Sequence, residues 1–192
     1  MIIKFYDLEK NLNKKINFYL LYGSNTGLID ETIKHTLAPN LSKNVIRYEE
    51  SEIINNLDIF NEEISNKSLF DDSKLILVNR VTDKILQIIE EIIEKNIDDI
   101  TIILRAGILD KKSKLRNFFE KEKNLACIPF YPDDFKNLNF ISQNFFRDRK
   151  IKVSQETINL IIERSNGSRQ HLKNELEKIG LYTANKKKVE FS

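Results

Sequence analysis

A turn with two glycines lies near the start of the chain, where backbone N–H groups could hold the phosphates of a nucleotide. The apolar run 16–22 leads into Gly23-Ser24-Asn25-Thr26-Gly27, and a helical pattern covers 28–37. A strand, a glycine turn and a helix in this order form a phosphate-binding arrangement. A working phosphate loop has four residues between its glycines and continues with Lys and then Ser or Thr. The pattern therefore makes nucleotide binding the first chemistry to consider.

The side chains for this chemistry are missing. Only three residues separate Gly23 from Gly27, and two aliphatic residues, Leu28 and Ile29, follow. They can neither neutralise a triphosphate nor hold Mg²⁺. No Asp or Glu directly follows the apolar runs that end at 78 and 104, where a hydrolytic enzyme of this kind needs one. We therefore interpret Gly23–Gly27 as a tight turn, a degenerate phosphate loop, and expect neither a bound cofactor nor ATPase activity.

The sequence contains no recognisable catalytic or metal-binding group. His35 and His171 occupy polar positions of helical patterns, and neither has a Cys or a carboxylate in ligand register. Cys127, the single cysteine, lies in an apolar run, where the role of a small hydrophobic residue is favoured over that of a nucleophile. We expect no catalytic residue, no metal site and no intramolecular disulfide, which fits a reducing cytoplasm.

Two neighbouring large apolar residues, Leu69 and Phe70, lie in an otherwise polar connection. Ser68 precedes them and Asp71-Asp72 follows. From the residues alone, a hydrophobic staple that packs back into the core is favoured. The alternative is a protruding pair that fits a partner's pocket and is kept in water by its polar neighbours.

Basic residues form two local groups. Lys111, Lys112 and Lys114 crowd the start of one helical pattern, and Arg and Lys residues gather again within 147–152. Solvated faces are the default interpretation, and a weak phosphate-contact surface is the alternative. No aromatic residues alternate with the lysines to stack on bases. Lys111, Lys112 and Lys114 are therefore kept as candidate DNA contacts.

Composition gives no overall sign of a nucleic-acid or membrane partner. The 192 residues carry 31 basic and 29 acidic side chains, which leaves a formal net charge of +2. No apolar stretch is long enough to span a bilayer, and charged residues soon follow Met1-Ile2-Ile3, so we expect no signal peptide. The expectation is a cytoplasmic protein without a membrane partner.

Five short apolar runs alternate with helical patterns as far as Tyr131. The runs are Phe18–Tyr22, Val45–Tyr48, Leu75–Val78, Thr101–Leu104 and Ala126–Pro129. Their Ile, Val and aromatic content suits strands buried on both faces. Between them we expect a helix that ends at Pro39, one helix over 53–64, and two more over 85–93 and 115–119. This alternation predicts a parallel α/β sheet.

The pattern changes after Tyr131. Three helical patterns follow and no further strand; Asp133 or Asp134 would cap the first, Ser154 the second and Ser168 the third. Helices without strands cannot continue the sheet. We therefore place a domain boundary here, with 1–131 as the α/β domain and 132–192 as a small helical domain.

Several runs together resemble the delta subunit of bacterial DNA polymerase III, a component of the sliding-clamp loader. They are Tyr19–Gly23 with the degenerate turn, Ser68–Leu75, Ala106–Leu115 and Asn174–Ile179. The order and spacing of these runs carry the resemblance, together with the change of pattern after Tyr131.

The resemblance implies an AAA+-like domain with a five-stranded parallel sheet that does not bind ATP, followed by a three-helix lid domain. Family members carry a third, helical collar domain that joins the other clamp-loader subunits. The chain is expected to lack this domain and to bind those subunits more weakly. Gln170 would replace the lid arginine of ATP-binding relatives, and the chain would be a non-catalytic subunit of the DNA polymerase holoenzyme.

For the apolar pair, the resemblance reverses the preference reached from the residues alone. Leu69 and Phe70, with Ser68, would form a hydrophobic wedge that binds the sliding clamp, the beta subunit, and helps to open the ring. DNA would be an indirect partner. Two other hypotheses stay open: an inactive AAA+-like scaffold, and a nucleic-acid-binding module that uses the basic groups.

Overall fold

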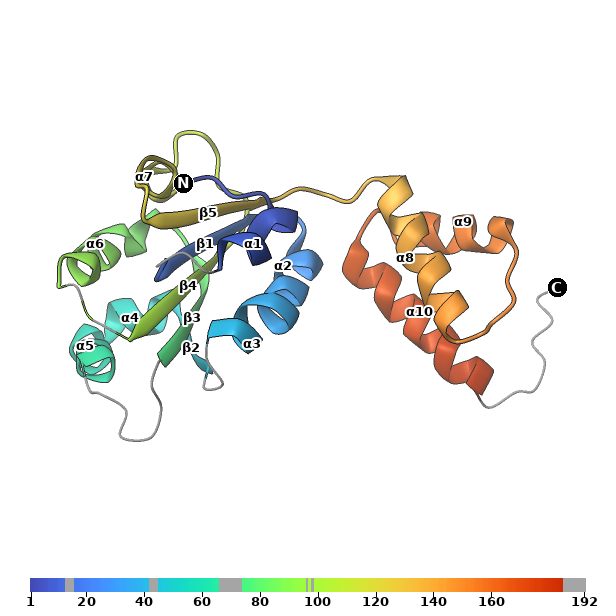
Figure 1. Ribbon diagram of the computed structural model, residues 1–192, viewed down its shortest axis with the longest axis horizontal. Coiled ribbons are helices and arrows are strands. Elements are labelled where there is room, and N and C mark those ends of the chain that lie inside the picture. The colour runs from blue at the N-terminus through green and yellow to red at the C-terminus, as the bar shows by residue number, and fades with distance from the viewer. Residues whose placement is uncertain (13–15, 42–44, 66–73, 96, 98, 185–192) are drawn as a thin grey trace. The chain divides into compact units, whose positions relative to one another are not determined.

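A five-stranded parallel sheet lies at the centre of the first of two units into which the chain divides, Met1–Phe130 and Tyr131–Ser192. Figure 1 shows the computed structural model, which describes residues 1–12, 16–41, 45–65, 74–95, 97 and 99–184. The strands are β1 (Phe18–Gly23), β2 (Val45–Glu49), β3 (Lys74–Val81), β4 (Ile100–Ala106) and β5 (Leu125–Phe130). They lie in the order β2-β3-β4-β1-β5. All five strands predicted from the sequence are confirmed, each extended by one to four residues.

The central parts of β1, β3, β4 and β5 are apolar because both faces of the sheet are covered. Leu20 and Leu21 are neighbours in β1 and therefore point to opposite faces, and both are fully buried. Figure 1 shows two groups of helices on opposite sides of the sheet. One group consists of α4 (Glu50–Asn55), α5 (Leu57–Ser65), α6 (Leu86–Glu94) and α7 (Lys114–Lys121). The other consists of α1 (Leu8–Asn11), α2 (Thr26–Thr32) and the π-helical turn Ile33–Leu37.

Two of the expected helices are interrupted. The helix expected to end at Pro39 passes from α2 through the π-helical turn, and α3 (Ala38–Leu41) then continues through the proline. The wider turn accommodates Pro39, whose ring would otherwise clash with the carbonyl four residues earlier. The single helix expected over 53–64 is broken at Asn56, whose backbone leaves helical geometry and whose side chain donates to the carbonyl of Glu52. These two expectations were wrong in detail.

Three helices around a core of their own form the second unit: α8 (Phe135–Asp148), α9 (Gln155–Arg164) and α10 (Arg169–Ala184). Asp134 rather than Asp133 caps α8, by accepting a hydrogen bond from the N–H of Asn137 at 2.7 Å, and Ser154 caps α9. The core residues are Leu138, Phe146, Ile158, Ile161, Ile162, Leu172 and Leu176. The predicted fold class, a parallel α/β domain followed by a three-helix domain, is thus confirmed. None of the described helices is long and apolar enough to cross a membrane.

Candidate functional site

The glycine turn lies at the carboxyl end of β1, next to the carboxyl end of β4. The segments that follow these two neighbouring strands pack on opposite faces of the sheet. The helix after β1 covers one face of the sheet and the helix after β4 covers the other. In α/β sheets this arrangement opens a crevice that commonly binds a ligand. Here the two strand ends are joined, because the N–H of Gly23 donates to the carbonyl of Gly107 at 3.0 Å.

Gly23 is explained by the backbone around it. Its φ is +139°, and a Cβ atom at this position would lie 2.1 Å from the carbonyl oxygen of Phe130, at the end of β5. Only glycine combines this backbone conformation with so close an approach. The first glycine of the degenerate phosphate loop therefore has a structural role at the β1–β5 junction.

The backbone N–H groups of the turn are largely engaged within the chain. Those of Asn25 and Thr26 donate to the carbonyls of Phe130 and Ser24, at 3.4 and 3.0 Å. The side chain of Asn25 caps α2 by accepting from the N–H of Leu28 at 3.1 Å, and its carbonyl accepts from the N–H of Ile29 at 3.1 Å. A phosphate loop instead directs such groups toward its ligand.

The positively charged side chain of Arg105 lies at the end of β4, where a hydrolytic enzyme would need a carboxylate. Arg105 Nη2 lies 2.9 Å from Asp30 Oδ1 and 3.1 Å from Oδ2, so the arginine is paired with α2. Its Nε is buried and finds no hydrogen-bond partner among the described residues. The end of β4 thus contributes a positive charge that is already paired.

The predicted clamp-binding residues Ser68, Leu69 and Phe70 lie outside the described residues, but the elements on either side are well defined. Lys74 at the start of β3 directs its ammonium group to the end of α5. Its Nζ donates to the carbonyl of Glu63 at 2.6 Å and lies 3.3 Å from Glu63 Oε1, and only 13% of the lysine side chain is exposed. This contact holds the end of α5 against the start of β3.

The start of α4 is attached to the other end of β3. The carboxylate of Glu50, 8% exposed, accepts from the N–H of Thr82 at 2.7 Å and from its hydroxyl at 2.9 Å. Glu49 forms a capping box with Glu52 and accepts from Arg80 Nε at 2.8 Å. Together, Lys74 and Glu50 fix the α4–α5 pair to β3 at both ends. The sequence analysis missed both contacts, because each joins residues at least 11 positions apart.

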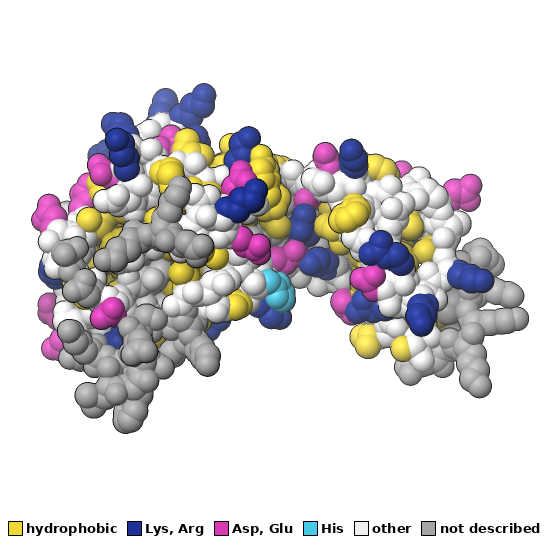
Figure 2. Space-filling model, viewed as in Figure 1, with side chains coloured by type: hydrophobic (Ala, Val, Ile, Leu, Met, Phe, Trp, Pro, Cys, Tyr) yellow, Lys and Arg dark blue, Asp and Glu magenta, His cyan; other side chains and the backbone are white. Residues whose placement is uncertain are grey.

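The candidate DNA contacts Lys111, Lys112 and Lys114 are exposed at the start of α7 and in the turn before it. This start is capped from a distance: Asp83 accepts from Ser113 Oγ at 2.6 Å and from the N–H groups of Lys114 and Leu115 at 3.0 Å. Burial opposes ionisation of Asp83, but these hydrogen bonds outweigh it and hold the pKa of its carboxyl below the usual value. Figure 2 shows Lys and Arg side chains interspersed with Asp and Glu on the face it presents.

The remaining reactive residues are dispersed. His35 and His171 are exposed on separate units, and the described residues contain no cluster of three or more metal-ligating side chains. Cys127 is fully buried in β5, and burial raises the pKa of its thiol to about 12. Gln170 is exposed and donates to Asn174 Oδ1 at 3.1 Å. Its neighbour Arg169 instead forms a two-point ion pair with Asp133 at 2.6 and 2.7 Å, a pair that the sequence analysis missed.

Comparison with known proteins identifies the family. A family model for the DNA polymerase III delta subunit matches residues 19–130, which is more than half of the chain. The chain belongs to this family. The match spans the sheet, the degenerate turn and the segment between α5 and β3 that contains Leu69 and Phe70. No curated protein sequence matches the chain.

Solved structures share the fold at low sequence identity. The clamp loader delta protein of Bacillus subtilis is 17% identical with a TM-score of 0.56; the similarity covers 96% of this chain and 59% of that protein. Domain III of the replication initiation protein DnaA from Thermotoga maritima is 15% identical, with a TM-score of 0.59 and coverage of 97% and 85%. RuvB of the same organism is 14% identical, with a TM-score of 0.63 and coverage of 96% and 63%. The sheet domain is thus AAA+-like, and the chain spans about three fifths of the Bacillus delta protein's length.

Proposed function

We propose that this chain binds a DNA polymerase sliding clamp through Leu69 and Phe70, with Ser68 beside them, and helps to open the ring during replication. The observation that carries the proposal is the delta-family match, which includes the segment between α5 and β3. The contacts of Lys74 and Glu50 support it, because they fix both elements that flank the segment. A rigid support reduces the entropy lost when a binding element is ordered on its partner.

The energetics of such a wedge are favourable. Burial of a Leu or Phe side chain in a partner's pocket supplies roughly 1.5–3 kcal/mol for each residue. If the pair binds a relaxed, open clamp better than a closed one, it shifts the ring toward opening by the difference in affinity and by no more. Opening of the ring in this way requires the chain to break no covalent bond.

We propose further that the chain performs this role without ATP. The short turn, its internally bonded N–H groups and the Arg105–Asp30 pair support this part of the proposal. Isothermal calorimetry with ATP and Mg²⁺ tests it. A dissociation constant in the low micromolar range, equivalent to roughly −8 kcal/mol, would contradict it.

The two domains would have different roles in clamp loading. In this proposal residues 1–131 form the clamp-binding AAA+-like domain and 132–192 the lid domain. The other clamp-loader subunits and, through the clamp, DNA would be the further partners. The Bacillus delta protein extends beyond the region matched by this chain, so stable assembly with those subunits is expected to need more than this region.

The decisive experiment compares clamp affinity and stability in one variant. Replacement of Leu69 and Phe70 by Ala should weaken binding to the sliding clamp of the same organism by about 2 kcal/mol or more, as for a central anchor pair. The melting temperature should change little if the pair is exposed in the free protein. Surface plasmon resonance and differential scanning calorimetry give the two readouts.

A matched control is available in α10, where Leu181 and Tyr182 form another adjacent apolar pair, 69% and 52% exposed. Their replacement by Ala should leave clamp affinity unchanged. Lost stability with unchanged clamp affinity in the Leu69/Phe70 variant would show a core staple instead. That result would favour the two other hypotheses, an inactive AAA+-like scaffold or a nucleic-acid-binding module. The second of these predicts a DNA affinity that falls steeply as the salt concentration rises.

A further inference from the structure

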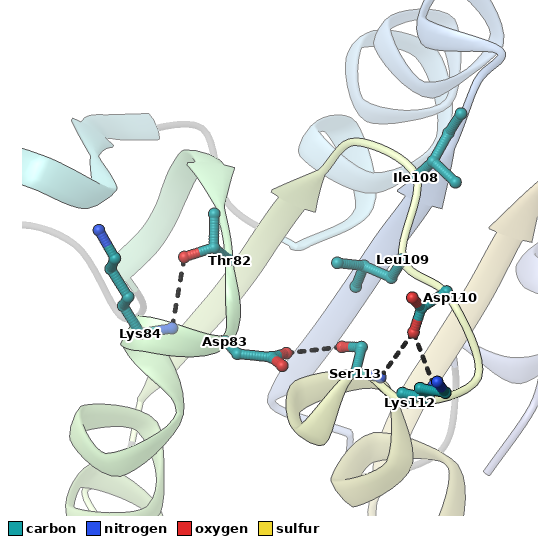
Figure 3. A pocket seen from close by; sticks show the side chains of 8 residues that line it. All are labelled: Thr82, Asp83, Lys84, Ile108, Leu109, Asp110, Lys112 and Ser113. Carbon is teal, nitrogen blue, oxygen red and sulfur yellow. Dashed lines mark hydrogen bonds between the residues drawn. The ribbon is translucent and has the colours of Figure 1, made fainter.

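A groove of about 480 Å³ lies between two segments that follow the neighbouring strands β3 and β4. Residues 82–84 form one side, and residues from the turn 108–113 form the other (Figure 3). Sites that hold small molecules or a few side chains commonly have volumes of this size. The groove lies within the delta-family match, in a run that the clamp-binding proposal does not use.

Hydrogen bonds hold the two sides together, so the groove exists before any partner binds. Asp83 reaches across to Ser113 and the start of α7, as Figure 3 shows. Asp110 Oδ1 accepts from the N–H groups of Lys112 and Ser113 at 2.6 and 3.1 Å, which fixes the turn itself. A preformed site loses less conformational entropy on binding.

Lysines outnumber carboxylates in and beside the groove, with Lys84, Lys111, Lys112 and Lys114 against Asp83 and Asp110. Asp83 and Asp110 already accept hydrogen bonds from the protein's own donors. The ammonium groups of Lys84 and Lys112, which line the groove, form no ion pair with any residue in the described part of the chain, and the same holds for Lys111 and Lys114 beside them. A partner with carboxylates would therefore find unpaired ammonium donors.

An apolar surface lies between these charges. Ile108 is 78% exposed and projects from the turn, and the half-buried Leu109 points toward the opposite side of the groove (Figure 3). An isolated exposed aliphatic residue needs no explanation, but one that lines a preformed groove beside unpaired cations forms a mixed surface. Such a surface suits a ligand with one apolar side chain between acidic ones.

We propose that this groove binds an acidic segment of a partner protein, with an aliphatic side chain against Ile108 and Leu109 and carboxylates paired with Lys84 and Lys112. Nucleic acid fits less well, because no aromatic residue lines the groove to stack on a base. The groove is a second interaction surface, and it does not depend on clamp binding through Leu69 and Phe70.

The test uses a synthetic ten-residue peptide with a central leucine between aspartates and glutamates, titrated into the ¹⁵N-labelled protein. Shifts of amide resonances should be confined to residues 82–84 and 107–115. Ile108→Ser and Lys112→Gln should each weaken binding by about tenfold, the size expected for a central anchor or a paired charge. Leu181→Ser and Lys121→Gln, which alter exposed residues elsewhere, should have no effect.

Two further peptides and one oligonucleotide complete the design. A peptide with Asn and Gln in place of the acids, and another with Ser in place of the leucine, should both bind about tenfold more weakly. Equal binding of either peptide, or no binding of the acidic peptide at millimolar concentration, would overturn the proposal. So would single-stranded oligothymidylate that binds the same residues more tightly than the peptide. Clamp affinity of Ile108→Ser, which should be unchanged, keeps this test separate from that of the clamp-binding proposal.

Discussion

Asp83, Glu50 and Lys74 are single charged residues that each join segments distant in the sequence. Asp83 caps α7 from 30 residues away, Glu50 binds Thr82, and Lys74 binds the end of α5. All three use hydrogen bonds to backbone groups, which would otherwise lack partners at the ends of helices and strands. At the residue scale, charged side chains thus stabilise both edges of the sheet: Asp83 and Glu50 act at the carboxyl edge and Lys74 at the amino edge.

Gly23→Ala should be strongly destabilising. The added Cβ would meet the carbonyl oxygen of Phe130, and the φ of +139° is strained for any L residue. We expect a loss of about 2–4 kcal/mol in the free energy of unfolding, measured by urea denaturation. Gly107→Ala is the control, because a Cβ there meets nothing within 4 Å. Equal losses in both variants would show that close approach at Gly23 is not the cause.

Asp83→Asn should reduce stability in a pH-dependent way. Because hydrogen bonds lower the pKa of Asp83 in the folded protein, its stabilising contribution is present above the unfolded pKa and is lost as pH falls through the folded pKa. Near neutral pH we expect a loss of about 1 kcal/mol, typical of a helix cap. The difference from the unmodified protein should shrink below about pH 4.

Urea denaturation over a pH series measures this difference. Glu9→Gln serves as a control, since the carboxylate of Glu9 is exposed and accepts no hydrogen bond from any other described residue. A difference for Asp83→Asn that stays constant as the solution is acidified would argue against a role for the ionised carboxylate.

At the scale of elements, α4 and α5 form an arm attached to β3 at both of its ends. Glu50 and Glu49 hold its start near Thr82 and Arg80, and Lys74 holds its end. The break at Asn56 divides the arm into two short helices, each too short to be stable alone, so tertiary contacts must hold them. The arm leads directly into the segment that carries Leu69 and Phe70.

Lys74→Met should therefore weaken both the arm and its proposed activity. Methionine retains the apolar stem but leaves the carbonyl of Glu63 without its cationic donor, at a cost of about 1–2 kcal/mol in stability. If the clamp-binding proposal holds, clamp affinity should fall by about tenfold as the arm loses its attachment. Lys95→Met is the matched control: Lys95 is exposed, and its ammonium donates to the half-buried side chain of Asn61 in α5 at 3.1 Å. Clamp affinity that changes equally in both variants would rule out a specific role for Lys74.

At the scale of the whole molecule, the two units have separate cores. The sheet unit contains two apolar clusters, one on each face of the sheet, and the helical unit contains a third. Proteins built in this way commonly unfold in parts, because each core stabilises only the elements around it. The proposed division of labour between a clamp-binding domain and a lid domain depends on this separation.

Phe146→Ala should destabilise the helical unit alone. Phe146 is buried in the core of that unit, and truncation of a core Phe costs about 3–5 kcal/mol. Hydrogen exchange should accelerate in residues 131–184 and stay unchanged in 1–130. Phe140→Ala, in the same helix but at an exposed position, should alter neither region. Accelerated exchange throughout the sheet in Phe146→Ala would show that the two units unfold together.

The sequence by itself determined the five strands, their parallel arrangement, the change to helices after Tyr131, the family and the missing phosphate-binding side chains. These features depend on the local periodicity of apolar residues and on residue types a few positions apart, both of which can be read directly from the sequence. The helix limits were predicted less accurately. The π-helical turn before Pro39 and the break at Asn56 are changes in backbone hydrogen bonding, and the spacing of apolar residues does not record them.

Only the tertiary structure decided which residues meet. It placed Phe130 against Gly23, Asp30 against Arg105, Asp83 at the start of α7 and Lys74 at the end of α5. It also brought residues 82–84 beside 108–113, which follow different strands and share no sequence pattern. Such pairs depend on strand order, and strand order is set by the packing of helices on the two faces of the sheet rather than by any local preference of the chain.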